Sequence, residues 1–210
     1  PVLGNLPKPQ KLTTAQLLEN LERAPTGTVA VLDTRGSRAD FMERHLPGAI
    51  YAPLDNTFPT IAGSYVDPNE SIYLLVENEA ALERAVRMLV RIGLDRICGY
   101  YPSGDLYVIP SDRMRRTERH STAELPRFAG ETNSLVLDVR KATEFAEGHA
   151  PNAKNIAHTR LAARLGELPR DRTLLMHCAS GKRAASAASF LEREGWTVRF
   201  FDGSYDEIPS

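Results

Sequence analysis

Cysteine, excess basic charge and long apolar runs are all scarce in this sequence. Its two cysteines, Cys98 and Cys178, and its five scattered histidines are too few for a disulfide framework or a zinc ligand set. No apolar stretch approaches the ~20 residues that cross a bilayer, and the start of the chain lacks a charged segment followed by an apolar one. The 26 Lys and Arg residues are balanced by 27 Asp and Glu residues, so no basic run could track a nucleic acid. We expect a soluble, cytoplasmic protein with no cofactor, no membrane partner and no nucleic-acid partner.

One of the two cysteines stands at a predicted junction between a strand and a helix. Cys178 follows the apolar residues 174–177 (LLMH) and precedes a short Ala-Ser-Gly turn, after which an alanine-rich helix begins. A helix N-terminus carries unpaired N–H groups and the positive end of the helix dipole, and Lys182 and Arg183 add two positive charges there. Each effect favours the thiolate over the thiol. Cys178 is therefore predicted to be a nucleophile and not a buried structural thiol.

The chain also contains an internal repeat of about a hundred residues. Residues 29–35 (VAVLDTR) reappear as residues 134–140 (SLVLDVR), and residues 41–50 (FMERHLPGAI) reappear as residues 145–154 (FAEGHAPNAK). A period this long indicates duplicated domains and not a solenoid, whose units run to roughly 20–50 residues. We predict two domains, over residues 1–110 and 111–210.

Short apolar runs alternate with helical patterns inside each repeat. Residues 72–76 and 173–177 read as buried strands, and residues 80–92 place Leu82, Val86 and Leu89 on one face of a helix. This alternation predicts an α/β fold in which each domain is a parallel sheet flanked by helices. Reactive groups gather at the carboxyl ends of strands in such sheets, which is where Cys178 would lie.

The repeated Leu-Asp-Val-Arg type segment, residues 144–153 (EFAEGHAPNA) and residues 178–183 (CASGKR) together resemble tandem rhodanese-type sulfurtransferases. The six-residue loop is the most specific of these elements, and the resemblance spans nearly the whole chain. It implies two rhodanese-like domains, with the catalytic one over residues 111–210. The implied reaction moves a sulfane sulfur from thiosulfate or a low-molecular-weight persulfide, through a persulfide on Cys178, to a thiophilic acceptor such as sulfite, glutathione or cyanide. Small anionic sulfur donors and acceptors are the implied partners.

The resemblance also implies roles for the loop residues. Cys178 would be the nucleophile, and backbone N–H groups would converge on its sulfur from a nest formed by Ala179, Ser180, Gly181, Lys182 and Arg183. Lys182 and Arg183 would attract donor anions, and Gly181 would allow a tight turn close to the ligand. The hydroxyl of Ser180 would either donate to the persulfide or cap the following helix.

Three polar residues near the loop are predicted to be structural, and a fourth is given no catalytic role. Asp138 and Arg140, at the end of a predicted strand, are expected to fix the backbone as a charged pair. His149 is expected to be a hydrogen-bond donor that fixes a turn. His177 precedes the nucleophile, but adjacent residues on a strand point to opposite faces, so we assign it no catalytic role.

The first repeat departs from the pattern at the loop. Residues 77–82 (ENEAAL) contain no cysteine and two carboxylates, so residues 1–110 are predicted to be a rhodanese-like domain without a catalytic cysteine. Its acidic loop would repel the anions that the second loop attracts. Cys98 lies in an apolar, strand-like run and is predicted to be a buried structural thiol.

Two other functions are compatible with these motifs. Cysteine-dependent phosphatases and arsenate reductases also place a thiolate in a loop that ends in arginine, but phosphatase loops have five residues between Cys and Arg, whereas four separate Cys178 from Arg183. A non-catalytic rhodanese-like interaction module is the other alternative.

The opening residues 1–10 (PVLGNLPKPQ), followed by an inactive and then an active repeat, are similar to the C-terminal rhodanese part of fusions with a metallo-β-lactamase-type persulfide dioxygenase. A persulfide dioxygenase domain in the same parent chain is therefore a further expected partner. The metal-binding His/Asp motif of such a dioxygenase is absent from this sequence.

Overall fold

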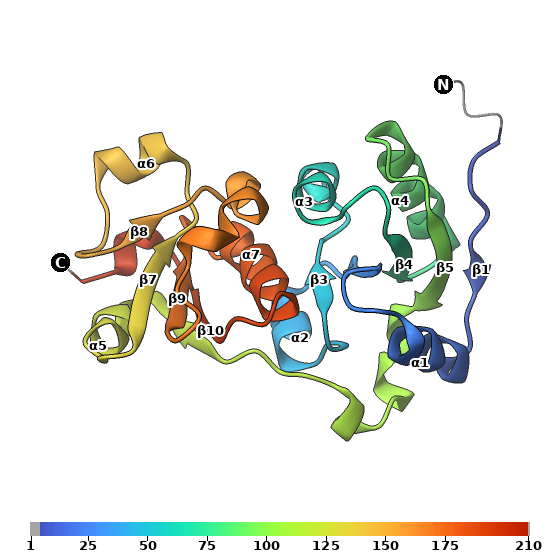
Figure 1. Cartoon of the computed structure of the whole chain (residues 1–210), viewed down its shortest axis with the longest axis horizontal. Coiled ribbons are helices and arrows are strands. Elements are labelled where there is room, and N and C mark those ends of the chain that lie inside the picture. Colours follow the sequence, from blue (N-terminus) through green and yellow to red (C-terminus); the bar gives the residue numbers. More distant parts are fainter. Residues whose placement is uncertain (1–4, 210) are drawn as a thin grey trace. The chain divides into compact units, whose positions relative to one another are not determined.

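The computed structural model describes residues 5–209, which form two compact units. Unit 1 comprises the chain up to Phe41 together with His45–Arg115, and unit 2 comprises Met42–Arg44 together with the chain from Arg116 onward. Each unit is built on one five-stranded sheet in which every pair of neighbouring strands is parallel (Figure 1). The first four residues of the segment 1–10 lie outside the described residues.

Unit 1 has the strand order β1-β5-β4-β2-β3. Helix α1 begins at a capping box, in which Thr13 and Gln16 each satisfy the other's backbone N–H. Helix α4 lies against strand β4 and helix α3. The elements are β1 (Gln10–Lys11), α1 (Thr14–Arg23), β2 (Val29–Asp33), α2 (Arg38–Glu43), β3 (Ala49–Tyr51), α3 (Phe58–Tyr65), β4 (Ser71–Val76), α4 (Glu79–Arg91), β5 (Ile97–Pro102) and the 3₁₀ turns η1 (Ser103–Val108) and η2 (Ser111–Arg113).

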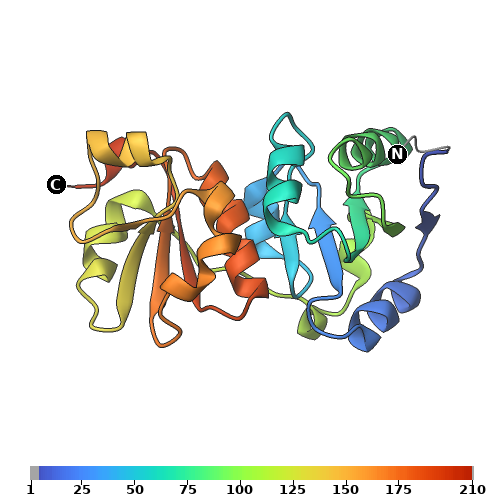
Figure 2. The ribbon, with the colours of Figure 1, turned by 45° about the horizontal axis from the view of Figure 1, so that its top comes forward.

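Unit 2 repeats this topology with the strand order β6-β10-β9-β7-β8. Figures 1 and 2 show helices α5 and α7 on opposite faces of its sheet. The elements are β6 (Arg119–Ser121), η3 (Thr122–Glu124), α5 (Leu125–Ala129), β7 (Ser134–Asp138), α6 (Ala142–Glu147), β8 (Lys154–Asn155), η4 (His158–Arg160), η5 (Ala162–Glu167), β9 (Thr173–His177), α7 (Lys182–Arg193), β10 (Val198–Asp202) and η6 (Tyr205–Glu207). The predicted α/β class, with a parallel sheet flanked by helices in each half, is confirmed.

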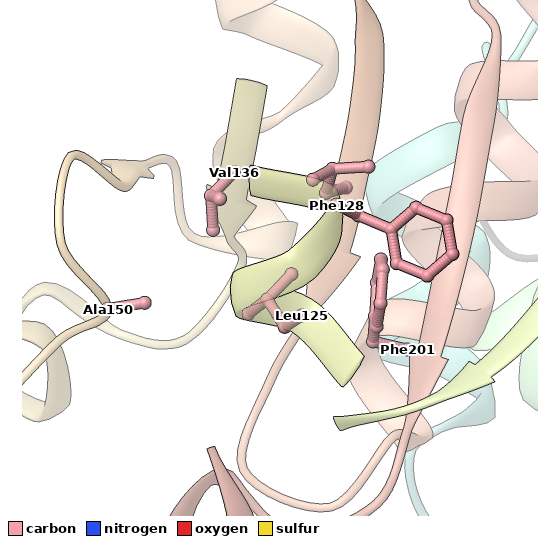
Figure 3. Close-up of a cluster of buried hydrophobic side chains, with 6 residues drawn as sticks. Leu125, Phe128, Val136, Ala150 and Phe201 are labelled. Atoms are coloured by element: carbon pink, nitrogen blue, oxygen red, sulfur yellow. The ribbon is translucent and has the colours of Figure 1, made fainter. Parts of the chain in front are cut away.

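Strand β9 lies at the centre of unit 2 and is buried on both faces. Leu174, Leu175 and Met176 are fully buried, which explains why β9 reads as a continuous apolar run and not as an alternating one. On one face, α5 contributes Leu125 and Phe128 to an apolar cluster with Val136, Ala150, Leu175 and Phe201 (Figure 3). The Phe128 and Phe201 rings meet edge to face, with centroids 5.6 Å apart.

The opposite face of this sheet is covered by a helix with small side chains. Helix α7 buries four alanines completely, and such short side chains let a helix backbone approach a sheet closely. These residues are Ala184, Ala185, Ala187 and Ala188. The start of α7 is thereby fixed next to the carboxyl end of β9.

Each unit contains the same local contacts as the other, in addition to the same topology. Asp33 and Arg35 form a buried two-pronged ion pair in unit 1, and Asp138 and Arg140 form the same pair in unit 2. In both units a histidine ring stacks on the phenylalanine four residues earlier and its Nδ1–H donates to that residue's carbonyl oxygen, at 2.8 Å for His45 and 3.0 Å for His149. The predicted structural roles of Asp138, Arg140 and His149 are confirmed.

The prediction for Cys98 is wrong, because its side chain is exposed. Residues alternate along β5, so that Ile97, Gly99 and Tyr101 are buried while Cys98 points to the other, more open side. The apolar composition of the run did not reveal which face each residue takes. Among residues 5–209, no helix combines the length and apolar character that crossing a membrane requires.

Candidate active site around Cys178

Cys178 occupies the turn between the end of β9 and the start of α7. Four residues, Cys178–Gly181, connect the two elements. Cys178 is only 1% exposed, so the expectation that its sulfur is not buried is wrong: the loop and the start of α7 cover it. Gly181 is the N-cap of α7 and has φ 81° and ψ −25°, the left-handed region that an L side chain rarely adopts. The glycine therefore lets the chain double back over the sulfur before the helix begins.

The sulfur of Cys178 accepts a hydrogen bond from the first turn of α7. The backbone N–H of Ala184 lies 3.4 Å from Sγ. Ala184 is the third residue of the helix, and no side chain caps α7 at Gly181, so Sγ takes the position that a capping oxygen normally occupies. This donor lies just beyond the predicted nest of residues 179–183, and sequence reasoning missed it because the chain geometry at Gly181 decides which amide faces the sulfur.

The matching helix of unit 1 begins differently. Only Glu77 and Asn78 lie between the end of β4 and the start of α4, and the Asn78 side chain accepts the N–H of Ala81 at 2.9 Å. Ala81 is the third residue of α4, so the same helix position is capped by an amide oxygen in unit 1 and by the cysteine sulfur in unit 2. The shorter turn in unit 1 has no room for a loop around a ligand.

The other predicted loop residues differ in exposure. Ser180 and Lys182 are exposed, Ala179 is half-buried and Gly181 is buried. The carbonyl oxygen of Ala179 accepts the backbone N–H of Tyr205 at 3.0 Å, which ties the loop to η6. Within residues 5–209, no hydrogen bond from the Ser180 side chain to the first turn of α7 is present.

Arg183 is held by an acidic residue that the sequence analysis did not single out. Its guanidinium donates two hydrogen bonds to Glu144 of α6, at 2.6 and 2.7 Å. The pKa of Glu144 is lowered to about 2, chiefly because of these hydrogen bonds. The pKa of Arg183 is raised, first by Glu144 and also by the nearby sulfur of Cys178. Arg183 thus lies beside the sulfur, but its charge is paired.

A buried ion pair is connected to the Cys178 loop through Tyr205. Arg140 forms its two-pronged pair with Asp138, donates to the carbonyl oxygen of Gly148 at 2.7 Å and lies 3.7 Å above the centre of the Tyr205 ring. Burial opposes the charge of Arg140, but its hydrogen bonds to Asp138 leave its pKa raised overall. Tyr205 therefore connects this pair to Ala179 and the loop, a role that sequence reasoning did not find.

Two histidines near the loop are held neutral by their surroundings. His177 is fully buried, with Nε2 3.9 Å from a carboxylate oxygen of Asp138, and burial lowers its pKa. His158 of η4 also has a lowered pKa, because of burial and of the positive charge on Arg183. In the part of the chain that the structure describes, no group of three or more His, Cys, Asp or Glu residues is arranged to hold a metal ion.

Comparison with known proteins finds similarity over part of unit 2. Residues 121–209 match the family model described as the Rhodanese-like domain. A protein named Sulfurtransferase from Allochromatium vinosum is 31% identical over 70 residues, which span 33% of this chain and 65% of that relative. The chain therefore spans just under two thirds of the length of this relative.

Two solved structures show similarity to different extents of the chain. A rhodanese-like domain protein from Staphylococcus aureus is 25% identical and covers 45% of this chain and 100% of its own, with a TM-score of 0.41. A thiosulfate sulfurtransferase from Pseudomonas aeruginosa is 18% identical and covers 96% of this chain and 45% of its own, with a TM-score of 0.42.

Proposed function

We propose that unit 2 is a sulfurtransferase that carries a sulfane sulfur as a persulfide on Cys178. The observation that carries this proposal is the hydrogen bond from the Ala184 N–H to Sγ at an otherwise uncapped helix N-terminus. A donor N–H and the positive end of the helix dipole stabilise a negative sulfur, whether it belongs to the resting thiolate or to the outer atom of a persulfide. The Rhodanese-like domain match over residues 121–209 and the sulfurtransferase relative support the same chemistry.

The reaction proceeds in two displacements at sulfur. The Cys178 thiolate attacks the sulfane sulfur of thiosulfate or of a low-molecular-weight persulfide, and the S–S bond of the donor breaks so that sulfite or a thiolate leaves with the bonding electrons. Sulfite, glutathione or cyanide then attacks the outer sulfur of the Cys178 persulfide, and the Cys178 thiolate is regenerated as the leaving group. Neither step needs a metal or an external oxidant.

The loop residues take supporting roles in this proposal. Gly181 and Ala184 shape the cradle around Sγ, and the exposed Lys182 supplies positive charge that attracts anionic donors. Only four residues separate Cys178 from Arg183, which favours transfer of a single sulfur atom over binding of a tetrahedral oxyanion.

Residues 1–110 are proposed to form a domain that carries no sulfur, and residues 111–210 the catalytic domain. The two-residue turn before α4 and the Asn78 cap support the first assignment, because together they leave the α4 N-terminus without a cradle or a nucleophile. A persulfide dioxygenase in the same parent chain would fit this chemistry, because its sulfite product is an acceptor for sulfane sulfur.

The test is the mass of the protein before and after reaction with thiosulfate or glutathione persulfide. We expect a gain of one sulfur on the peptide that contains Cys178 and its loss when cyanide or sulfite is added. Because Cys98 is exposed, it can also react, and Cys98→Ser serves as the matched control that must still gain one sulfur.

Cys178→Ser is expected to gain no sulfur and to show no turnover, because a hydroxyl is not ionised at neutral pH. Retained turnover in Cys178→Ser would eliminate this residue as the carrier. No sulfur gain with either donor in the wild type, combined with hydrolysis of an aryl phosphate, would favour the phosphatase alternative.

A further inference from the structure

The charge beside Cys178 depends on Glu144 as much as on the basic residues of the loop. Glu144 lies on α6, and its carboxylate binds both prongs of the Arg183 guanidinium. The same carboxylate accepts the backbone N–H of Lys141 at the start of α6, at 3.1 Å, so it is fixed from both sides. The side chains of Glu144 and Arg183 are 30% and 25% exposed, which places the pair at the surface of the site.

This ion pair determines how much positive charge an approaching sulfur donor meets beside Cys178. Two-pronged guanidinium–carboxylate contacts are strong and geometrically specific, so Arg183 remains paired unless a ligand outcompetes Glu144. Glu144 stays ionised throughout the neutral range, since its pKa is held at about 2 by Arg183. His158 adds no charge at neutral pH. Lys182, which is exposed, is then the loop cation that remains without an ion pair in the described residues.

We infer that Glu144 is a specificity-determining residue: by pairing with Arg183 it cancels positive charge beside Cys178, and so favours low-molecular-weight persulfides over dianionic donors such as thiosulfate. The inference rests on the proposed sulfur transfer at Cys178. It differs from a purely structural role, in which Glu144 would only hold Arg183 in place and would affect all reagents at the sulfur equally.

The test compares two alkylating reagents of nearly equal size, anionic iodoacetate and neutral iodoacetamide. Both reactions are followed on the Cys178 peptide by mass spectrometry, because the exposed Cys98 reacts too. Any change in the fraction of thiolate affects both rates alike, so their ratio reports the charge that the reagent meets. Glu144→Gln keeps an oxygen that can accept from Arg183 and removes the negative charge. We expect it to raise the iodoacetate/iodoacetamide rate ratio by about two- to fivefold at low salt.

Glu167→Gln is the matched control. Glu167 forms a two-pronged ion pair with Arg164 at 2.6 and 2.8 Å in the same unit, and its pKa is likewise lowered to about 2. It is expected to leave the ratio unchanged. The double variant Glu144→Gln/Arg183→Gln replaces a neutral pair by another neutral pair and is expected to return the ratio to that of the wild type.

Turnover tests the consequence for donors. Glu144→Gln is expected to raise kcat/KM for thiosulfate by about two- to fivefold and to raise kcat/KM for a singly charged persulfide donor by less. An unchanged alkylation ratio, or equal losses with both reagents, would overturn the charge role of Glu144. A raised ratio in a protein that transfers no sulfur from either donor would instead refute the proposed function and leave the charge role standing.

Discussion

The partly buried carboxyl group of Glu192 should make unit 2 less stable above neutral pH than in mild acid. Glu192 lies near the end of α7 and accepts a hydrogen bond from the Thr117 hydroxyl at 2.8 Å. Burial raises its pKa from the ordinary value of 4.5 to about 7, while the Thr117 bond opposes the rise. The folded state therefore binds this proton more tightly than the unfolded state does. The stability that this group contributes is fully present below about pH 4.5 and is lost as the pH rises through about 7.

The magnitude follows from the two pKa values. Each tenfold change in proton affinity is worth about 1.4 kcal/mol, so the displacement from 4.5 to about 7 corresponds to at most about 3.5 kcal/mol. Glu192 keeps partial exposure, and we expect about 1–3 kcal/mol. Glu192→Gln removes the titration while keeping an acceptor for Thr117. Relative to the wild type, it should therefore stabilise unit 2 by this amount at pH 8.5 and much less at pH 5.

Urea unfolding followed by tryptophan fluorescence measures this difference directly. Trp196 is the only tryptophan of the chain, is buried and lies just beyond α7, so its emission reports the unfolding of unit 2. Glu194→Gln, two residues further along the chain, serves as the control and should show the pH dependence of the wild type. If Glu192→Gln and the wild type lose stability in parallel between pH 5 and 8.5, the buried carboxyl group is not the cause and the reasoning is refuted.

Substitutions at three further positions test the support of the loop. Gly181→Ala should cost about 1–2 kcal/mol of unit 2 stability, measured by Trp196 fluorescence, because φ is 81° there; an unchanged midpoint would show that the loop relaxes freely. Arg140→Lys should cost roughly 2 kcal/mol of unit 2 stability and slow the loading of sulfur onto Cys178, because lysine cannot make the two-pronged contact with Asp138. Equal loading rates in this variant and the wild type would show that the ion pair does not position the loop. Tyr205→Phe should leave the urea unfolding midpoint nearly unchanged, whereas Tyr205→Leu should lose about 0.5–2 kcal/mol of stability, because it removes the aromatic ring that contacts the Arg140 guanidinium. Equal losses of stability in the two variants would contradict this contact.

The internal repeat made the fold largely predictable. Residues 29–33 (VAVLD) and 134–138 (SLVLD) end in the same three residues, and they form strands β2 and β7 at equivalent places in two sheets of identical order. The expected helix at residues 80–92 forms as α4 over Glu79–Arg91. The local sequence pattern was sufficient here, because a strand buried on both faces and an amphipathic helix each show in their own sequence which residues are buried.

The candidate site is visible in the sequence, but the contacts that surround it are not. The strand, glycine turn and helix around Cys178 are contiguous, so their order is visible in the chain. The partner of Arg183 is Glu144, which is 39 residues away and is brought close only by the packing of α6. Ala184 looks like any other alanine of the helix, since its contribution is a backbone N–H. Cys98 shows the same limit, because strand pairing and not composition decides which face a residue takes.

The N-termini of α4 and α7 are capped in different ways, and this difference limits how the turn of one unit could be converted into that of the other. In unit 1 the cap is one side chain, Asn78, directly before α4, whereas in unit 2 the sulfur that serves the equivalent amide stands three residues ahead of the N-cap Gly181. A thiol introduced at position 78 would lie at the N-cap itself, with no loop of backbone between it and the helix. Converting the turn of unit 1 into the turn of unit 2 therefore requires two inserted residues, which single-residue replacements do not provide.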